Sequence, residues 1–185
     1  FGGHVLMTSP EHASGTDRCA EAARILAAEK TFDVVLNIQG DEPFIRPEQI
    51  TELKNSFTPG VGIATLARRI NNMAELENPN KPKVVTGKNG DAIFFSRSVI
   101  PFLRGFDRSE WISNHPFLAH VGLYGYRKEI LQEITRLPQG NLEKAESLEQ
   151  LRWLENGYKI RVTETAYSSY GIDTPEDLAF AMQLF

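Results

Sequence analysis

An acidic residue, Asp41, follows a predicted strand, residues 33–39, with Val34, Leu36 and Ile38 on one face, and a glycine, Gly40. In open α/β sheets, ligands gather just beyond the carboxyl ends of the strands, so a carboxylate at this place is available for chemistry. Asp41 is equally suited to cap local amides in a turn, and the local sequence does not decide between the two roles. The adjacent Glu42 has no predicted role beyond the turn.

A second acid, Asp173, lies at a later transition from strand to loop. Thr174 is the better cap for the helix that follows, because Pro175 then falls at the first helical position. Asp173 is left without a capping task, although an Asx-type hydrogen bond across the turn is an alternative. Two such carboxylates can share a hard cation such as Mg²⁺ if their strands are neighbours.

The segment HASGTDR, residues 12–18, combines hydroxyls, a glycine and a predicted helix start. Free amides at a helix N-terminus suit an anion or a nucleotide. The segment is not a P-loop, because the pattern GxxxxGK[ST] is absent. Capping alone is the alternative role for Ser14 and Thr16.

In the predicted strand at residues 118–127, alternation places His120, Gly122, Tyr124 and Tyr126 on one face. The glycine leaves space on a polar, aromatic surface, which suits a hydroxylated ligand. The alternative is a surface strand with amphipathic side chains. Arg97, on a predicted hairpin, can bind a carboxylate with two hydrogen bonds or can simply be solvated.

A predicted helix at residues 141–156 carries Glu146, Glu149, Gln150 and Trp153 on one flank, at helical spacing. Polar groups on this flank can contact a ligand. A surface ion pair between Glu149 and Arg152 is the favoured alternative until a partner surface is identified.

Strands and helices alternate along the chain, and this alternation predicts an α/β layered fold with a hairpin-rich insertion. An Asn89-Gly90 turn is expected to join the paired strands of the insertion. Strands are predicted near residues 4–7, 33–39, 61–69, 83–86, 92–99, 118–127 and 158–163. Helices are predicted at residues 16–30 with Thr16 as the cap, 47–57, 75–78, 129–137, 141–156 and from Thr174 onward, with an irregular loop at 102–116.

The composition restricts the class of protein. A chain of 185 residues suits one domain, and a net charge of −4 argues against a protein that follows a nucleic-acid backbone. The single cysteine, Cys19, excludes an internal disulfide and a cysteine metal cluster, which favours a reducing compartment. No apolar run approaches membrane-spanning length.

Seven segments, in this order, resemble the bacterial cytidylyltransferases that activate 3-deoxy-manno-octulosonate (Kdo). They are HASGTDR, VVLNIQGDEPFI, NPNKPKVV, IFFSRSVIP, HVGLYGYR, ESLEQLRWLENGYKI and GIDTPEDL. The resemblance implies a single Rossmann-like nucleotidyltransferase domain over residues 1–185, in which helices flank a mixed sheet. It also implies a smaller β-rich, sugar-binding and dimerisation subdomain at about residues 80–127, a homodimer, a cytoplasmic location, and Mg²⁺ and CTP as cofactor and cosubstrate.

The resemblance also assigns roles to residues. The metal-binding and catalytic aspartates fall on Asp41 and Asp173. Contacts to the nucleotide and its metal fall on Ser14, Arg18, Gln39 and Asp41. Contacts to the sugar acid fall on Arg97, His120, Tyr124, Glu149 and Gln150.

The resemblance further implies transfer of a cytidylyl group from CTP to the anomeric hydroxyl of Kdo, with release of pyrophosphate, for lipopolysaccharide biosynthesis. The family opens with a strand, a phosphate loop and a helix that have no counterpart here, so a chain truncated at its N-terminus is expected, with the phosphate half of the site before residue 1. Transfer to another acidic sugar, such as a sialic acid, is one rival function. An inactive binding or dimerisation fragment is another.

Overall fold

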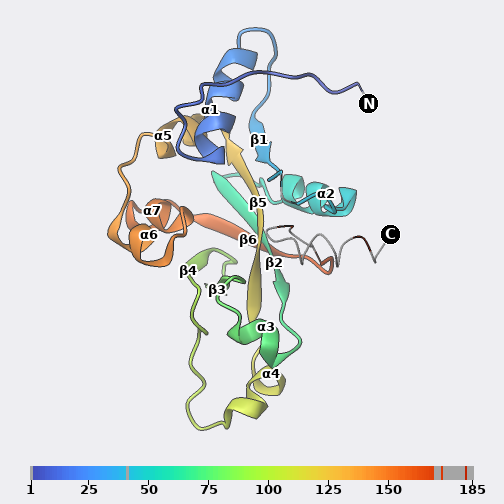
Figure 1. The fold of residues 1–185 in the computed structure, drawn as a ribbon, viewed down its shortest axis with the longest axis vertical. Coiled ribbons are helices and arrows are strands. Elements are labelled where there is room, and N and C mark those ends of the chain that lie inside the picture. The colour runs from blue at the N-terminus through green and yellow to red at the C-terminus, as the bar shows by residue number, and fades with distance from the viewer. Residues whose placement is uncertain (1, 41, 169–171, 173–181, 183–185) are drawn as a thin grey trace.

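The fold is built around one ten-residue strand, β5 (Leu118–Arg127). In the computed structural model, which describes residues 2–40, 42–168, 172 and 182, β2 (Ile63–Arg69) pairs antiparallel with β5 along one edge. The other edge of β5 is shared by β1 (Val34–Asn37), beside its C-terminal half, and β3 (Lys83–Thr86), beside its start. Figure 1 shows β5 running along the long axis of the molecule.

Two further strands complete the sheet. β4 (Ala92–Ser96) pairs antiparallel with β3, and β6 (Ile160–Glu164) pairs parallel with β2. The strand order is β4-β3-β5-β2-β6, with β1 beside β5. The sheet is therefore mixed, as predicted, and the strands of the predicted insertion are continuous with it.

Helices flank this sheet on two sides. Figure 1 shows α6 and α7 on one side and α2 on the other, while α1 and α5 lie together at one end of the long axis and α3 and α4 at the opposite end. The helices are α1 (Gly15–Leu26), α2 (Pro47–Asn55), α3 (Met73–Glu77), α4 (Trp111–Asn114), α5 (Lys128–Ile134), α6 (Asn141–Glu146) and α7 (Gln150–Glu155). The predicted α/β class is confirmed. No helix in the described part of the chain is long and apolar enough to cross a membrane.

The predicted hairpin is confirmed around Gly90, which has the positive φ of +80° that favours glycine. Its carbonyl accepts a hydrogen bond from the amide of Val162 on β6 at 2.9 Å. The neighbouring Asp91 accepts from Nε of Arg161 at 2.9 Å. The tip of the hairpin is thus fastened to the far strand of the same sheet.

Two predictions near the N-terminus are wrong. Residues 4–7 form no strand; Val5 and Met7 are 90% and 85% exposed, and no described strand pairs with them. Ser14, rather than Thr16, caps α1, because Ser14 has the extended backbone of a cap residue and its hydroxyl accepts from the amide of Asp17 at 3.2 Å. α1 also ends at Leu26, before the predicted Lys30.

The single helix predicted at residues 141–156 is also wrong, because it is broken into α6 and α7 at Ser147, whose φ is +51°. Ser96, the last residue of β4, and Arg97, which follows it, hold the break. Nε of Arg97 donates to the carbonyl of Glu146 at 2.6 Å, and the Glu146 carboxylate accepts from the Ser96 hydroxyl at 2.6 Å and the Arg97 amide at 2.8 Å. These tertiary hydrogen bonds outweigh the local preference for a continuous helix.

The loop predicted at residues 102–116 is more ordered than expected. It contains a 3₁₀ turn, Arg108–Glu110, and α4. The cause is the buried ring of Trp111, which stacks at 6.1 Å on Phe117 and meets the edge of Phe102 at 5.2 Å.

Candidate active site

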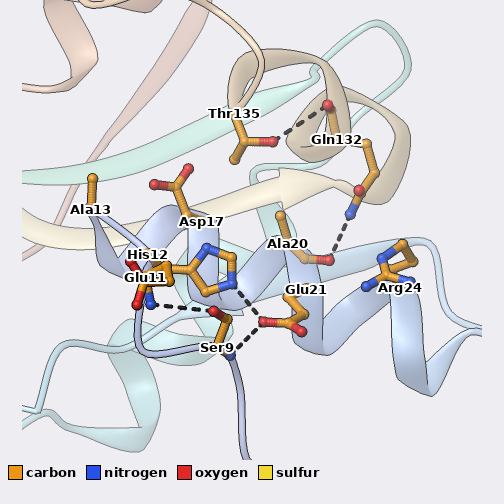
Figure 2. Close-up of a pocket in the computed structure, with 10 residues that line it drawn as sticks. All are labelled: Ser9, Glu11, His12, Ala13, Asp17, Ala20, Glu21, Arg24, Gln132 and Thr135. Atoms are coloured by element: carbon orange, nitrogen blue, oxygen red, sulfur yellow. Dashed lines mark hydrogen bonds and ion pairs between the residues drawn. The ribbon is translucent and has the colours of Figure 1, made fainter.

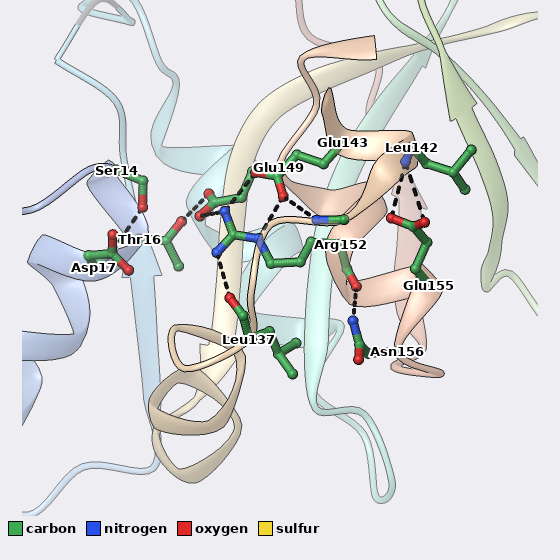
Figure 3. A network of polar contacts seen from close by, with 11 residues as sticks. Ser14, Thr16, Asp17, Leu137, Leu142, Glu143, Glu149, Arg152, Glu155 and Asn156 are labelled. Carbon is green, nitrogen blue, oxygen red and sulfur yellow. Dashed lines mark hydrogen bonds and ion pairs between the residues drawn. The ribbon is translucent and has the colours of Figure 1, made fainter. Parts of the chain in front are cut away.

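A hydrogen bond joins the start of α1 to the start of α7. Thr16 is buried, and its hydroxyl donates to Oε2 of Glu149 at 2.6 Å. Figure 3 shows the carboxylate of Glu149 between the first turn of α1, with Ser14 and Thr16, and the side chain of Arg152. A residue predicted to contact the nucleotide, Ser14, therefore lies beside one predicted to contact the sugar acid.

Glu149 is not part of a solvated surface pair, so that alternative is wrong. The side chains of Glu149 and Arg152 are only 26% and 14% exposed, and Nη2 of Arg152 lies 3.8 Å from Oε1 of Glu149. Arg152 binds more closely to Glu143, at 2.6 and 2.7 Å. Burial raises the pKa of Glu149 above its ordinary value, although the hydrogen bond from Thr16 acts in the opposite direction.

We expect Glu149→Gln to stabilise the fold at neutral pH. A carboxyl whose folded pKa lies above its unfolded value of 4.5 destabilises the fold when it is ionised. The cost is absent below pH 4.5 and reaches its full size once the pH has risen through the folded pKa. Thermal unfolding at pH 8 should give a higher melting temperature for the variant, and the difference should disappear near pH 4. A variant less stable than wild type at pH 8 would contradict this account of Glu149.

Four buried donors lack partners next to this carboxylate. Among the described residues, no hydrogen bond of ordinary geometry reaches the hydroxyls of Tyr124 and Tyr126, Nε2 of Gln150 or Nε1 of Trp153. Both tyrosine rings meet the edge of Trp153, at 5.3 and 5.6 Å. An unpaired buried polar group costs roughly 1–3 kcal/mol, so four of them together indicate a place that water or the oxygen atoms of a ligand complete.

His120 extends this surface along β5. Its ring lies 5.1 Å from that of Tyr124, and Tyr124 stacks at 6.0 Å on Tyr126, so the predicted shared face is confirmed. Nε2 of His120 lies 3.0 Å from the hydroxyl of Thr65. Burial lowers the pKa of His120 to about 4, so the imidazole is neutral at physiological pH. The alternative of a solvent-exposed strand is wrong, because most of β5 is buried.

Comparison with known proteins identifies the family. The family described as Cytidylyltransferase matches residues 1–160. The 3-deoxy-manno-octulosonate cytidylyltransferase of Parabacteroides distasonis is 54% identical to this chain, over 98% of the chain and 74% of that protein. The chain belongs to the 3-deoxy-manno-octulosonate cytidylyltransferase family. The member from Bacteroides thetaiotaomicron is 55% identical over 98% of this chain and 73% of its own.

A solved structure of the same family supports the fold. It is the structure of CMP:2-keto-3-deoxy-manno-octonic acid synthetase complexed with CTP, which is 39% identical to this chain. It superimposes with a TM-score of 0.85 over 99% of this chain and 72% of that one. The predicted Rossmann-like nucleotidyltransferase fold is thereby confirmed for this cytidylyltransferase.

The structure describes three further residues assigned through the family, namely Arg97, Arg18 and Gln39. Arg97 is not simply solvated, since its guanidinium donates to the carbonyls of Pro79, Glu146 and Ser147. Arg18 is exposed and donates to Thr8 and Ser9, and Gln39 is exposed just beyond β1. Their substrate contacts stay predictions. Asp41 and Asp173 lie outside the described residues.

A cavity of about 470 Å³ lies between α1 and α5, and Figure 2 shows its lining. Its polar centre is Glu21, which accepts from the amide of Ser9 at 2.8 Å and lies 2.5 Å from Nε2 of His12. The cavity contains none of the site residues that the family resemblance assigns. Its lining residues are Ser9, Glu11, His12, Ala13, Asp17, Ala20, Glu21, Arg24, Gln132 and Thr135.

Sequence reasoning missed four residues of the candidate site. Tyr126 and Trp153 were placed on the right faces but given no role, and Thr16 and Thr65 were treated as a cap and as part of a strand. Alternation along β5 already places Tyr126 on the same face as His120 and Tyr124, but the family resemblance assigns it no contact. No local pattern marks Thr65, whose partner His120 is 55 residues away.

Proposed function

We propose that this protein transfers a cytidylyl group from CTP to the anomeric hydroxyl of Kdo, giving CMP-Kdo and pyrophosphate. The observation that carries the proposal is the contact between Thr16 and Glu149, which joins the predicted nucleotide loop to the donor-rich surface of β5 and α7. The identity to enzymes named for this reaction supports the same substrates. The solved relative in complex with CTP supports CTP as the donor.

The chemistry of the site suits a hydroxylated acid. Neutral donors on Tyr124, Tyr126 and Gln150 can bind carboxylate and hydroxyl oxygens, and they are held in place by packing before any ligand arrives. Glu149 offers an acceptor for sugar hydroxyls. Arg97, which donates to the carbonyl of Ser147 in the turn before α7, is proposed to direct its remaining donors to the carboxylate of the sugar.

The transfer itself needs alignment and charge neutralisation more than a covalent intermediate. The anomeric oxygen forms a bond to the α-phosphorus of CTP, and the bond from that phosphorus to the bridging oxygen breaks. Pyrophosphate leaves with the electron pair, and the hydroxyl proton passes to water. Ser14, Arg18 and Gln39 are proposed to hold the nucleotide, while the face of His120 and Tyr124 orients the sugar.

Mg²⁺ is the proposed cofactor, and Asp41 and Asp173 would hold it. Their carboxylate oxygens are the hard ligands that Mg²⁺ prefers. The described flanks of Asp41 fit a ligand there, because Gln39 and Gly40 are exposed beyond β1 and the amide of Glu42 donates to the carbonyl of Gln39 at 3.2 Å. When bound, the ion neutralises phosphate charge and lowers the pKa of the attacking hydroxyl.

We further propose that the protein is a cytoplasmic homodimer, in which the subdomain at about residues 80–127 forms the contact between copies. Its product is proposed to serve lipopolysaccharide biosynthesis. Large apolar side chains exposed on this subdomain support a covered surface, namely Ile93, Phe102 and Phe106. A monomeric mass in analytical ultracentrifugation at micromolar concentration would argue against the dimer.

Pyrophosphate release by the full chain tests the reaction. With CTP and Mg²⁺, we expect kcat/KM for Kdo to exceed that for a sialic acid by roughly a hundredfold or more, because a site built to pair particular hydroxyls leaves its buried groups unpaired with the wrong sugar. Equal use of the two sugars would contradict the assignment of Kdo. No release with either sugar would favour the second candidate, a binding or dimerisation module.

A further inference from the structure

Thr65 lies on β2 at an irregularity in its pairing with β5. Thr65 pairs with Tyr124, whereas the next residue, Leu66, pairs with Val121, so Gly122 and Leu123 are extra residues on β5. The side chain of Thr65 is fully buried. The bulge brings two carbonyls of β5 to its hydroxyl: that of Leu123 at 2.8 Å and that of Val121 at 3.3 Å.

The same hydroxyl lies 3.0 Å from Nε2 of His120. A threonine hydroxyl has one proton, and a carbonyl oxygen can only accept. The proton of Thr65 therefore points to the carbonyl of Leu123, and Oγ1 is left to accept a hydrogen bond from the histidine. The opposite arrangement, with the Thr65 proton on Nε2, would place two oxygens 2.8 Å apart with no proton between them.

The position of the imidazole proton follows from these contacts. The low pKa of His120 makes the ring neutral, so it carries one N–H, and Nε2 must hold it. Nδ1 is then an acceptor. No hydrogen bond from another described residue reaches Nδ1, and the ring is half-buried beside Tyr124.

We propose that Thr65 is a positioning residue that holds His120 as its Nε2–H tautomer, so that Nδ1 accepts a hydrogen bond from a hydroxyl of the sugar acid. The inference rests on the proposed function and adds to it the orientation of the bound sugar. A lone pair on Nδ1 attracts a hydroxyl proton and repels a carboxylate. The sugar therefore turns a hydroxyl toward His120 and its carboxylate toward the donors on Tyr124, Gln150 or Arg97.

Packing keeps the ring in this orientation. Phe95, which is fully buried, meets the imidazole edge-on at 5.2 Å, and Tyr124 flanks it at 5.1 Å. The hydroxyl of Tyr124 also faces Thr65 without reaching hydrogen-bond geometry. The ring cannot easily rotate to exchange its two nitrogens, so the tautomer depends on Thr65.

Nitrogen-15 NMR of the full chain, labelled at histidine and measured without substrates, reads the tautomer directly. We expect wild type and Thr65→Ser to show protonated Nε2 and unprotonated Nδ1, and Thr65→Val to show a mixture of tautomers. In steady-state assays, Thr65→Val should raise KM for Kdo about fivefold to tenfold, which corresponds to the loss of one hydrogen bond to the sugar. KM for CTP should not change. Thr65→Ser should restore KM for Kdo.

Thr163→Val is the matched control, since Thr163 lies on the neighbouring β6 and its hydroxyl contacts Ser56 at 2.7 Å, away from His120. It should keep the wild-type tautomer and KM. Protonated Nδ1 in wild type would overturn the proposal without any variant, and so would a normal KM for Kdo in folded Thr65→Val. If wild type shows the expected tautomer but never turns over Kdo, the proposed function fails instead.

Discussion

Asp41→Asn should abolish measurable cytidylyl transfer, a loss of roughly three orders of magnitude or more, because charge neutralisation supplies most of the catalysis in phosphoryl transfer. An amide oxygen is a neutral ligand and binds Mg²⁺ less tightly than a carboxylate does. Less bound Mg²⁺ neutralises less of the phosphate charge. The measurement is pyrophosphate release from CTP and Kdo across a titration of Mg²⁺. The fold should persist, since the last paired residue of β1 is Asn37.

Asp33→Asn is the control for this experiment, because Asp33 is exposed and immediately precedes the start of β1, at the opposite end of that strand. It should leave turnover within about twofold of wild type, as surface substitutions usually do. Near-normal turnover of Asp41→Asn at saturating Mg²⁺ would remove Asp41 from the proposed metal site.

Glu143→Gln should lower the free energy of unfolding by about 3 kcal/mol. Glu143 and Arg152 form a bidentate pair at 2.6 and 2.7 Å, and their side chains are 7% and 14% exposed (Figure 3). Removing Glu143 leaves the largely buried guanidinium of Arg152 with only the more distant carboxylate of Glu149, at 3.8 Å, and this costs far more than the loss of an exposed pair. Urea denaturation at pH 7 measures the change.

The pH dependence gives a second measurement. Burial alone would raise the pKa of Glu143, but the hydrogen bonds and charge of Arg152 outweigh it and lower the pKa below the ordinary value of 4.5. The stabilisation is therefore present above pH 4.5 and is lost as the pH falls through the folded pKa. The difference between Glu143→Gln and wild type should shrink under acid conditions.

Glu164→Gln provides the comparison, since Glu164 pairs with Arg69 at 3.1 Å and the two side chains are 53% and 63% exposed. It should cost less than about 1 kcal/mol. If the two variants lose the same free energy of unfolding, the pair of Glu143 and Arg152 contributes no more than a surface contact, and burial does not strengthen it.

The parts of the fold that the sequence predicted well depend on local pattern. The bounds of β5 were predicted as observed, since the apolar residues Ala119, Val121 and Leu123 alternate with a face that carries His120, Tyr124 and Tyr126. The turn at Gly90 was predicted because few residues other than glycine tolerate its φ. Family motifs placed Glu149, Gln150, Tyr124 and His120, which the structure brings to one region through α7 and β5.

The failures come from contacts between distant segments. The break at Ser147 is imposed by Arg97, 50 residues earlier, and no propensity within residues 141–156 announces it. Residues 4–7 have the composition of a strand, but a strand exists only where a partner offers hydrogen bonds. Thr16 and Thr65 gain their roles from Glu149 and His120, which only the tertiary structure brings near them.

The continuity of β5 limits how the protein can move. A lobe that swings on a hinge needs a flexible connection, whereas here one strand, continuous through the bulge at Gly122 and Leu123, carries both ends of the molecule. It pairs with β1 at one end and with β3 at the other. The attachment of Gly90 to Val162 braces the hairpin against rotation. We therefore expect the face of His120 and Tyr124 to act as a preformed template for the proposed sugar substrate rather than to close around it.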